Sequence, residues 1–148
     1  MTSDINPQIF REYDIRGVVG KDLNATTVLQ IGKAIGTYMK RQGGKTLVVG
    51  RDVRSSSVEF RDILSAALTS TGCNIIDIGM VPTPVAYFAL HHLKADGGVM
   101  ITGSHNPPEF NGFKISLGHH SLYGEKIQEL KSLIDAQDFE TGSGTVEQ

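Results

Sequence analysis

The stretch from Val99 to Lys114, VMITGSHNPPEFNGFK, decides the predicted fold, because it joins two predicted strands through a loop. It also contains the side chains most suited to catalysis or ligand binding. Its apolar run Val99–Ile101 predicts a short buried strand, and the two prolines further on can neither continue a strand ladder nor enter a helix interior. Ser104 is therefore expected in a loop at the carboxyl end of a strand. In open α/β sheets this end is where ligands bind.

A second strand is expected directly after this loop. Phe113 and Ile115 alternate there with Lys114 and Ser116, so Lys114 lies on the face opposite the buried side chains and can reach a cleft. Only about ten residues without a helix join the two strands, which favours an antiparallel pair in an otherwise parallel sheet.

Predicted strands and helices alternate along the rest of the chain, and this order predicts an α/β fold. We expect a three-layer α/β/α sandwich with a mainly parallel, mixed sheet of about four to five strands. The domain is expected over residues 1–138, and residues 139–148 read as a polar linker towards domains that this chain does not contain. The expected elements are an extended segment up to Gly20, a helix from Asn24 to Gly43, a strand over 47–50, a helix with capping-box spacing at Ser56 and Glu59, a strand over 74–79, a helix opened by Pro82 with Val85, Phe88, Ala89 and Leu93 on one face, and a final helix containing Tyr123, Ile127, Leu130 and Ile134.

Composition excludes several classes of function. The 148 residues carry a formal net charge of -2, without the basic excess that nucleic-acid binding usually needs, so no nucleic-acid partner is expected. Cys73 is the only cysteine, which rules out an internal disulfide. With neither a signal peptide nor an apolar run long enough to cross a bilayer, the expected location is the cytoplasm, without a membrane partner.

Three motifs carry a resemblance to a known family. They are FREYDIRG at residues 10–17, GRDVRSSS at residues 50–57 and TGSHNPPEFNGFK at residues 102–114. The last resembles the phosphoserine loop of the α-D-phosphohexomutases, the phosphomannomutases and phosphoglucomutases, and all three occur in the family's order. The YDIRG form is more similar to these members than to the phosphoglucosamine branch. The resemblance covers only domain I of the family's four domains.

The resemblance implies that Ser104 is a phosphoserine that donates its phosphoryl group to a hexose 1- or 6-phosphate and recovers one from the resulting bisphosphate. It implies Mg²⁺ as a cofactor, bound through the Ser104 phosphate with its other ligands in a missing domain, and hexose 1,6-bisphosphate as activator and intermediate. The hexose phosphate and the remaining domains of the polypeptide are the implied partners. The implied catalytic residues are Ser104, Lys114, Arg16 and His105, and the implied substrate-binding residues are Tyr13, Arg16, Asn106 and Lys114.

Two other functions were weighed for the loop. A serine hydrolase would need a base for Ser104, but the adjacent His105 has poor geometry for this and there is no G-x-S-x-G elbow. A stand-alone sugar-phosphate-binding or regulatory module, without catalysis, remains the alternative. Because no D-G-D-G-D run occurs, the carboxylates expected to hold magnesium are missing, and the isolated chain is expected to be inactive.

Individual residues also have structural interpretations. Arg16 can be a solvated loop arginine, Tyr13 can pack rather than line the cleft, and Lys114 can be a solvated strand lysine. Arg51 and Asp52 either belong to a phosphate site or pair with each other or with neighbouring loops. No function is assigned to the histidine pairs, of which His91-His92 is expected in the last turn of a helix and His119-His120 in an exposed polar turn.

Overall fold

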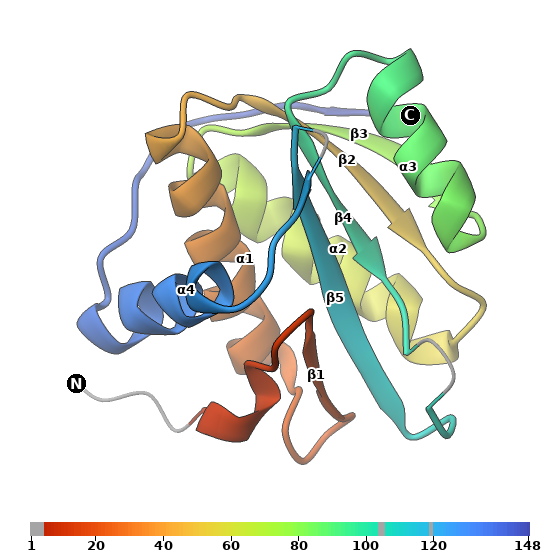
Figure 1. Ribbon diagram of the computed structural model, residues 1–148, viewed down its shortest axis with the longest axis vertical. Coiled ribbons are helices and arrows are strands. Elements are labelled where there is room, and N and C mark those ends of the chain that lie inside the picture. Colours follow the sequence, from red (N-terminus) through yellow and green to blue (C-terminus); the bar gives the residue numbers. More distant parts are fainter. Residues whose placement is uncertain (1–4, 104–105, 119) are drawn as a thin grey trace.

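The computed structural model describes residues 5–103, 106–118 and 120–148 (Figure 1). The elements, in chain order, are a 3-10 helix at Pro7–Ile9, β1 (Ile15–Val18), α1 (Ala25–Arg41), β2 (Thr46–Arg51), α2 (Ser55–Ser70), β3 (Asn74–Met80), α3 (Thr83–His92), β4 (Gly97–Ile101), β5 (Phe110–Leu117), β6 (His120–Ser121), α4 (Glu125–Ala136) and β7 (Val146–Glu147).

One mixed sheet organises the described residues, with strand order β1-β5-β4-β2-β3-β7 and with β6 paired to β5. The strands β4, β2, β3 and β7 are parallel, whereas β5 runs antiparallel to β4, β1 and β6. The predicted α/β class and the antiparallel strand after the loop are confirmed. The sheet has seven strands in this part of the chain, more than expected, because β6 and β7 are two residues long and too short to show a hydrophobic period.

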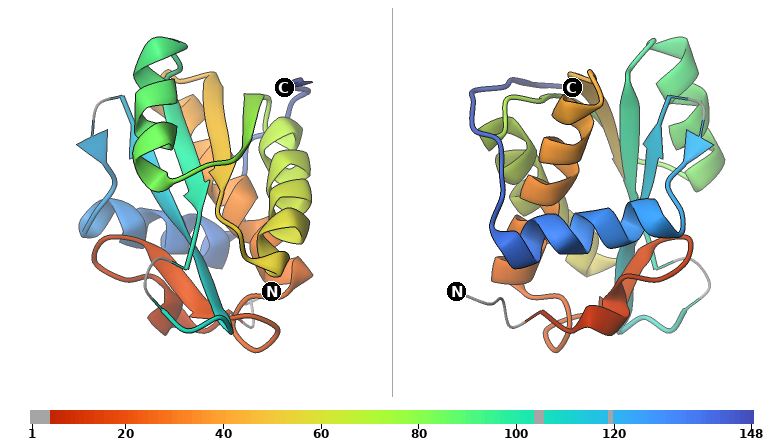
Figure 2. Two further views of the ribbon diagram at one scale, coloured as in Figure 1. Left: turned by 90° about the vertical axis from the view of Figure 1, so that its right-hand side faces the viewer. Right: turned by 60° about the vertical axis from the view of Figure 1, so that its left-hand side comes forward.

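Helices cover both faces of the sheet, so the three-layer arrangement is confirmed. Helices α1, α2 and α4 lie on one face and α3 lies on the other (Figure 2). The main core is between the sheet and the first group of helices, and it includes Ile35, Leu47, Leu64, Ile101 and Phe113. The opposite face of β5 and β1 is therefore free to carry polar side chains.

The helix starts show one success and one error of the sequence pattern. Asn24 caps α1, because its side chain accepts a hydrogen bond from the Thr27 backbone at 2.9 Å. The capping box predicted from Ser56 and Glu59 is wrong: the N-cap is Arg54, two residues before Ser56, so α2 begins at Ser55 and has no side-chain cap. The Ser56 hydroxyl instead accepts a hydrogen bond from the buried Asn111 side chain, at 2.8 Å. A long-range contact thus replaces the local one.

Helix α3 packs differently from what its apolar pattern indicates. Val85, Phe88 and Leu93 are exposed, at 42%, 66% and 43%, whereas Leu90 is buried. The apolar face with Val85, Phe88 and Leu93 is therefore exposed, and the buried Leu90 makes the contact with the sheet instead. His91 and His92 lie in the last turn of this helix, as predicted.

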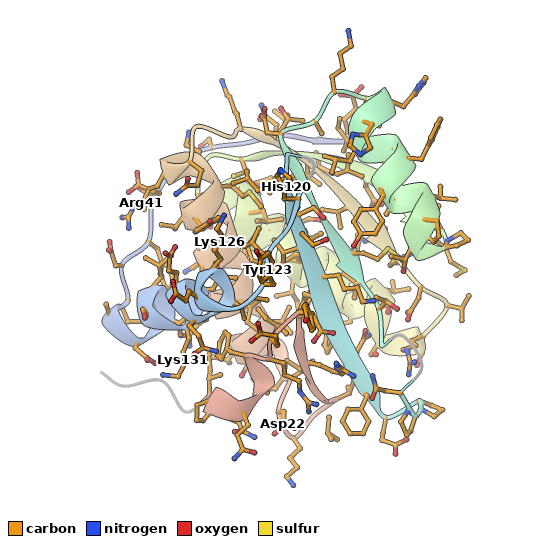
Figure 3. The ribbon with its side chains drawn as sticks, viewed as in Figure 1. Asp22, Arg41, His120, Tyr123, Lys126 and Lys131 are labelled. Carbon is orange, nitrogen blue, oxygen red and sulfur yellow. The ribbon has the colours of Figure 1, made fainter. Side chains whose placement is uncertain are left out.

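The segment 139–148, predicted as a linker, lies against the domain. At the end of α1, Arg41 (Figure 3) pairs with Asp138 at 2.8 Å and with Glu140 at 2.9 Å. Further on, Gly142 donates a backbone hydrogen bond to Ser70, and β7 pairs with β3. A connection from here to further domains stays a prediction. None of the helices in the described ranges is long and apolar enough to cross a membrane.

Candidate functional site

The predicted phosphoserine loop leaves the sheet at the carboxyl end of β4 and returns as β5. Ser104 and His105, two of the predicted catalytic residues, lie outside the described residues. The residues on either side are described: the backbone and side-chain nitrogens of Asn106 donate to the Gly103 carbonyl, at 3.0 and 2.8 Å. These two bonds tie Asn106 to Gly103, so the Asn106 amide nitrogen is used in shaping the loop.

Arg54, which the sequence interpretation did not single out, binds backbone carbonyls of this loop. Its Nη1 donates to the carbonyls of Pro107 and Phe110, at 2.8 and 3.1 Å, and its Nη2 donates to the carbonyl of Asn106 at 2.9 Å. Its Nε donates to Asp52 Oδ2 at 3.1 Å. The guanidinium therefore joins the loop to the start of α2.

Asp52 is the second residue of this arrangement. Its Oδ2 accepts from the Gly103 backbone at 3.1 Å, and its Oδ1 accepts from the Arg54 backbone at 3.0 Å and the Ser57 hydroxyl at 2.7 Å. Asp52 thus pairs with Arg54 and the neighbouring loop, which is one of the alternatives given above, and no ion pair among the described residues joins it to Arg51. The Nε and Nη1 atoms of Arg51 are buried and have no hydrogen-bond partner among the described residues.

The local signal for Arg54 is its spacing from Asp52. An aspartate that accepts a hydrogen bond from the backbone two residues later forms an Asx turn, which folds the chain back on itself. This turn brings the Arg54 side chain within hydrogen-bond distance of the loop. Its carbonyl partners lie more than fifty positions away in the sequence, so no local pattern identifies them.

The ionised form of Asp52 is favoured by its surroundings. Burial raises the pKa of this carboxyl, but hydrogen bonds from the Ser57 hydroxyl, the Arg54 and Gly103 backbones and the Thr102 hydroxyl outweigh burial, and the pKa is lowered from 3.8. A carboxyl whose pKa is lower in the folded state than in the unfolded state stabilises the fold above its unfolded pKa. This stabilisation is lost as the pH falls through the folded pKa.

Replacing Asp52 by asparagine is therefore expected to destabilise the domain in a pH-dependent way. At pH 7 the loss should be about 2 kcal/mol, because the Arg54 charge is left without its carboxylate. The difference from the unsubstituted chain should begin to shrink as the pH falls below about 4, where the unfolded carboxyl is protonated, and should be smallest below the lower folded pKa. Urea unfolding between pH 7 and pH 2.5 measures it, with Asp135→Asn on exposed α4 as the control. A difference that is constant over this range contradicts the assignment.

Arg16 and Lys114 project from the same face of the sheet. The register places Arg16 opposite Gly112 on β5, and Lys114 is two residues further along that strand. Opposite residues on paired strands share a face, as do residues two apart on one strand. Arg16 is half buried, and its Nη2 lies 3.4 Å from Asp14 Oδ1. Its buried Nε has no hydrogen-bond partner within the described ranges. Neither Arg16 nor Lys114 is fully solvated, because Lys114 is also half buried.

Lys114 borders three hollows on this face, of which two bear on the site. One lies towards the loop base and is lined by Asp52, Thr102 and residues at the start of α3. The other is aromatic and is lined by Tyr13, Tyr87, His120 and Tyr123. Figure 3 labels His120 and Tyr123, which come from the segment between β5 and α4. Lys114 thus lies between the hollow at the loop base and the hollow lined by tyrosines.

Tyr13 belongs to the hollow and not to the core, since it is 73% exposed. Among the histidines, His120 is exposed, as predicted, and His119 lies outside the described residues. His92 stacks on Phe88 with ring centroids 5.5 Å apart. The structure therefore brings Arg16 and Lys114 to the face next to the loop, places Tyr13 in the hollow that Lys114 also lines, and leaves His91 and His92 at the end of α3.

Magnesium was expected through the Ser104 phosphate. In the described part of the chain, no three histidine, cysteine, aspartate or glutamate side chains are placed to hold a metal ion. Asp52, beside the loop, already accepts hydrogen bonds from Arg54, Ser57 and Gly103. These residues by themselves do not fit a magnesium site, and any such site needs oxygen ligands from elsewhere.

Comparison with known proteins identifies the class to which this fold and loop belong. The model of phosphoglucomutase/phosphomannomutase, alpha/beta/alpha domain I, matches residues 7–141. A phosphomannomutase/phosphoglucomutase of Pseudomonas aeruginosa is 49% identical over 140 residues, and a phosphoglucomutase of Neisseria meningitidis serogroup B is 45% identical over 137. These matches cover 95% and 93% of this chain and 30% of each relative.

A solved structure agrees with the sequence relatives. The crystal structure of a phosphoglucomutase/phosphomannomutase family protein from Burkholderia thailandensis has a TM-score of 0.92 and 45% identity, and the match covers 97% of this chain and 33% of that one. The chain therefore belongs to the phosphoglucomutase/phosphomannomutase family and corresponds to its domain I. It spans about 30% of the length of the curated relatives it matches.

Proposed function

We propose that this chain is the phosphoserine-bearing domain of a phosphohexomutase that interconverts the 1- and 6-phosphates of mannose, glucose or both. Ser104 carries the phosphoryl group. The observation that supports this most strongly is the placement of Arg16 and Lys114 on one face of the sheet beside the loop that contains Ser104. A phosphoserine carries nearly two negative charges at neutral pH, and phosphoryl transfer depends mainly on positioning and charge neutralisation.

The proposed reaction has two transfers. In the first, a hydroxyl oxygen of the hexose phosphate attacks the phosphorus and gives up its proton, the bond from phosphorus to Ser104 Oγ breaks, and Ser104 Oγ takes up a proton to become a hydroxyl. The product is a hexose 1,6-bisphosphate. In the second, Ser104 Oγ loses its proton and attacks the other phosphate of the bisphosphate, the bond from that phosphorus to the sugar oxygen breaks, and the sugar oxygen takes up a proton. The phosphoserine is therefore restored, and the sugar leaves with its phosphate on the other carbon.

The residues of this chain have distinct proposed roles in these transfers. Arg16 offsets charge on the phosphoryl group, and Lys114 offsets charge and exchanges the proton as general acid or base. Tyr13 lines the side from which the sugar approaches. Asn106 shapes the loop through its two bonds to Gly103, and His105 orients the loop or the phosphoryl oxygens. Mg²⁺, if present, would add positive charge at the Ser104 phosphate with ligands from outside this chain.

An isomerisation assay tests this function. The purified chain alone is expected to give no turnover, because the described residues form neither a magnesium site nor an enclosed sugar site. The chain joined to, or mixed with, the remaining two thirds of a full-length relative is expected to be active. Substantial turnover by the chain alone contradicts the first expectation. Failure of Ser104 to accept phosphate with the remaining domains present favours a binding or regulatory module.

A further inference from the structure

We propose that Arg54 is a positioning residue whose guanidinium, fixed by Asp52, sets the backbone of the loop so that Ser104 can accept and donate a phosphoryl group. This inference rests on the proposed function. Arg54 does not need to contact the substrate for this role, because it acts through the loop backbone.

The loop has more backbone acceptors than donors, for a reason contained in its sequence. Proline has no backbone N–H, so Pro107 and Pro108 remove two donors from the loop but leave its carbonyls in place. The carbonyls of Asn106 and Pro107, which precede these two prolines, are two of those that Arg54 binds. A buried carbonyl without a donor is costly. Arg54 supplies the donors that the loop lacks.

The shape of the guanidinium matters for this task. It presents five N–H donors in a fixed planar fork, and here the donors reach three carbonyls and one carboxylate at once. The Arg54 side chain is only 14% exposed, so its direction is held by these partners. A lysine has the same charge but is a compact point charge, and it cannot hold the same set of groups.

The Arg54 guanidinium lies directly against Gly103, the residue before Ser104 in the sequence. A Cβ at Gly103 would overlap the Arg54 guanidinium, and Arg54 Nη2 would be 2.7 Å from it. The absence of a side chain therefore lets the guanidinium lie against the backbone of the residue that precedes Ser104. Gly103 also donates its N–H to Asp52, the carboxylate that binds Arg54. A change in the Arg54–Asp52 pair is therefore expected to alter the backbone of Gly103, the residue before Ser104 in the sequence.

Arg61, on the helix that Arg54 directly precedes, provides a matched control. It is also half buried and pairs with Asp77 at 2.8 Å and with Asp62 at 2.7 Å, but no recorded hydrogen bond or ion pair links it to the loop. Arg61→Lys and Arg54→Lys therefore make the same chemical change in two carboxylate-paired arginines. Only the second should alter the geometry around Ser104.

The test uses the chain joined to the remaining domains and follows three quantities. These are the thermal midpoint, the rate at which hexose 1,6-bisphosphate phosphorylates Ser104 by intact mass, and kcat and KM for isomerisation. Arg54→Lys is expected to fold and to slow both phosphorylation and kcat by about 100-fold, with KM changed less than about threefold, because positioning is lost and not substrate binding. Arg61→Lys should leave the phosphorylation rate unchanged.

The outcomes separate this inference from the function on which it rests. If the unsubstituted enzyme does not phosphorylate Ser104, the proposed function fails. If it does, and Arg54→Lys is phosphorylated at the same rate, only the role of Arg54 is overturned. Equal losses in Arg54→Lys and Arg61→Lys likewise overturn it, because they indicate general destabilisation. Should Arg54→Lys not fold, Gly103→Ala displaces the guanidinium while retaining Arg54, and normal phosphorylation of that folded variant overturns the inference.

Discussion

Replacing Ser104 by alanine is expected to reduce hexose-phosphate isomerisation by about 10⁴-fold or more in the complete enzyme, with no comparable loss of stability. The proposed cycle passes every phosphoryl group through the Ser104 hydroxyl, so the variant has no oxygen to receive it. Removing the nucleophile from an enzyme that uses covalent catalysis typically costs activity on this scale. Steady-state isomerisation with hexose 1-phosphate, combined with thermal unfolding, measures both quantities.

Ser132→Ala is the control for this variant. It removes the same hydroxyl from the exposed face of α4, where Ser132 Oγ donates to the Gln128 carbonyl at 3.2 Å. Its isomerisation rate should equal that of the unsubstituted enzyme. Retention of more than about one hundredth of the activity by Ser104→Ala would be incompatible with a phosphoserine cycle, since no alternative acceptor is part of the proposal.

Replacing Lys114 by alanine is expected to have the second-largest effect, a fall in kcat of about 10²- to 10³-fold. Lys114 is half buried between the loop base and the tyrosine-lined hollow, where a cation both offsets phosphate charge and can exchange a proton. General acid–base catalysis alone typically contributes about 10²- to 10⁴-fold. The rate of isomerisation at saturating substrate, followed across pH, is the measurement.

Two further variants divide these roles. Lys114→Arg keeps the positive charge but does not release a proton at neutral pH, so it should remain near the alanine level if proton exchange dominates. Lys45→Ala removes an exposed lysine at the amino end of β2, far along the sheet from the loop, and should leave kcat unchanged. Full activity in Lys114→Ala would remove this residue from the mechanism.

The sequence predicted those parts of the fold that follow from local periodicity. The apolar spacing of α1 and its Asn24 cap give that helix correctly, and the alternation along β5 places Lys114 opposite the core. What local patterns did not predict depends on tertiary contacts. Strand β7 has two residues and exists because it pairs with β3, and Ser56 bonds Asn111 in place of forming a capping box.

The candidate site likewise contains residues that local motifs predict and a residue whose role depends on tertiary contacts. The motifs predict Arg16 and Lys114 as site residues, which stays a prediction, and the strand register explains why they share a face. Arg54 was missed because its significance arises from three carbonyls of a loop that is distant in sequence. Its spacing from Asp52 is a weak signal by itself, since a D-x-R sequence is compatible with many turns.

Intact-mass measurement of Ser104 tests the central claim most directly. The chain joined to its remaining domains is incubated with hexose 1,6-bisphosphate, its mass is determined, and the modified peptide is mapped. The account predicts a gain of one phosphoryl group, located on Ser104 and transferred back to added hexose phosphate, with no gain in Ser104→Ala. An enzyme that isomerises its substrate while Ser104 stays unmodified, or that carries the phosphate on another residue, would contradict it.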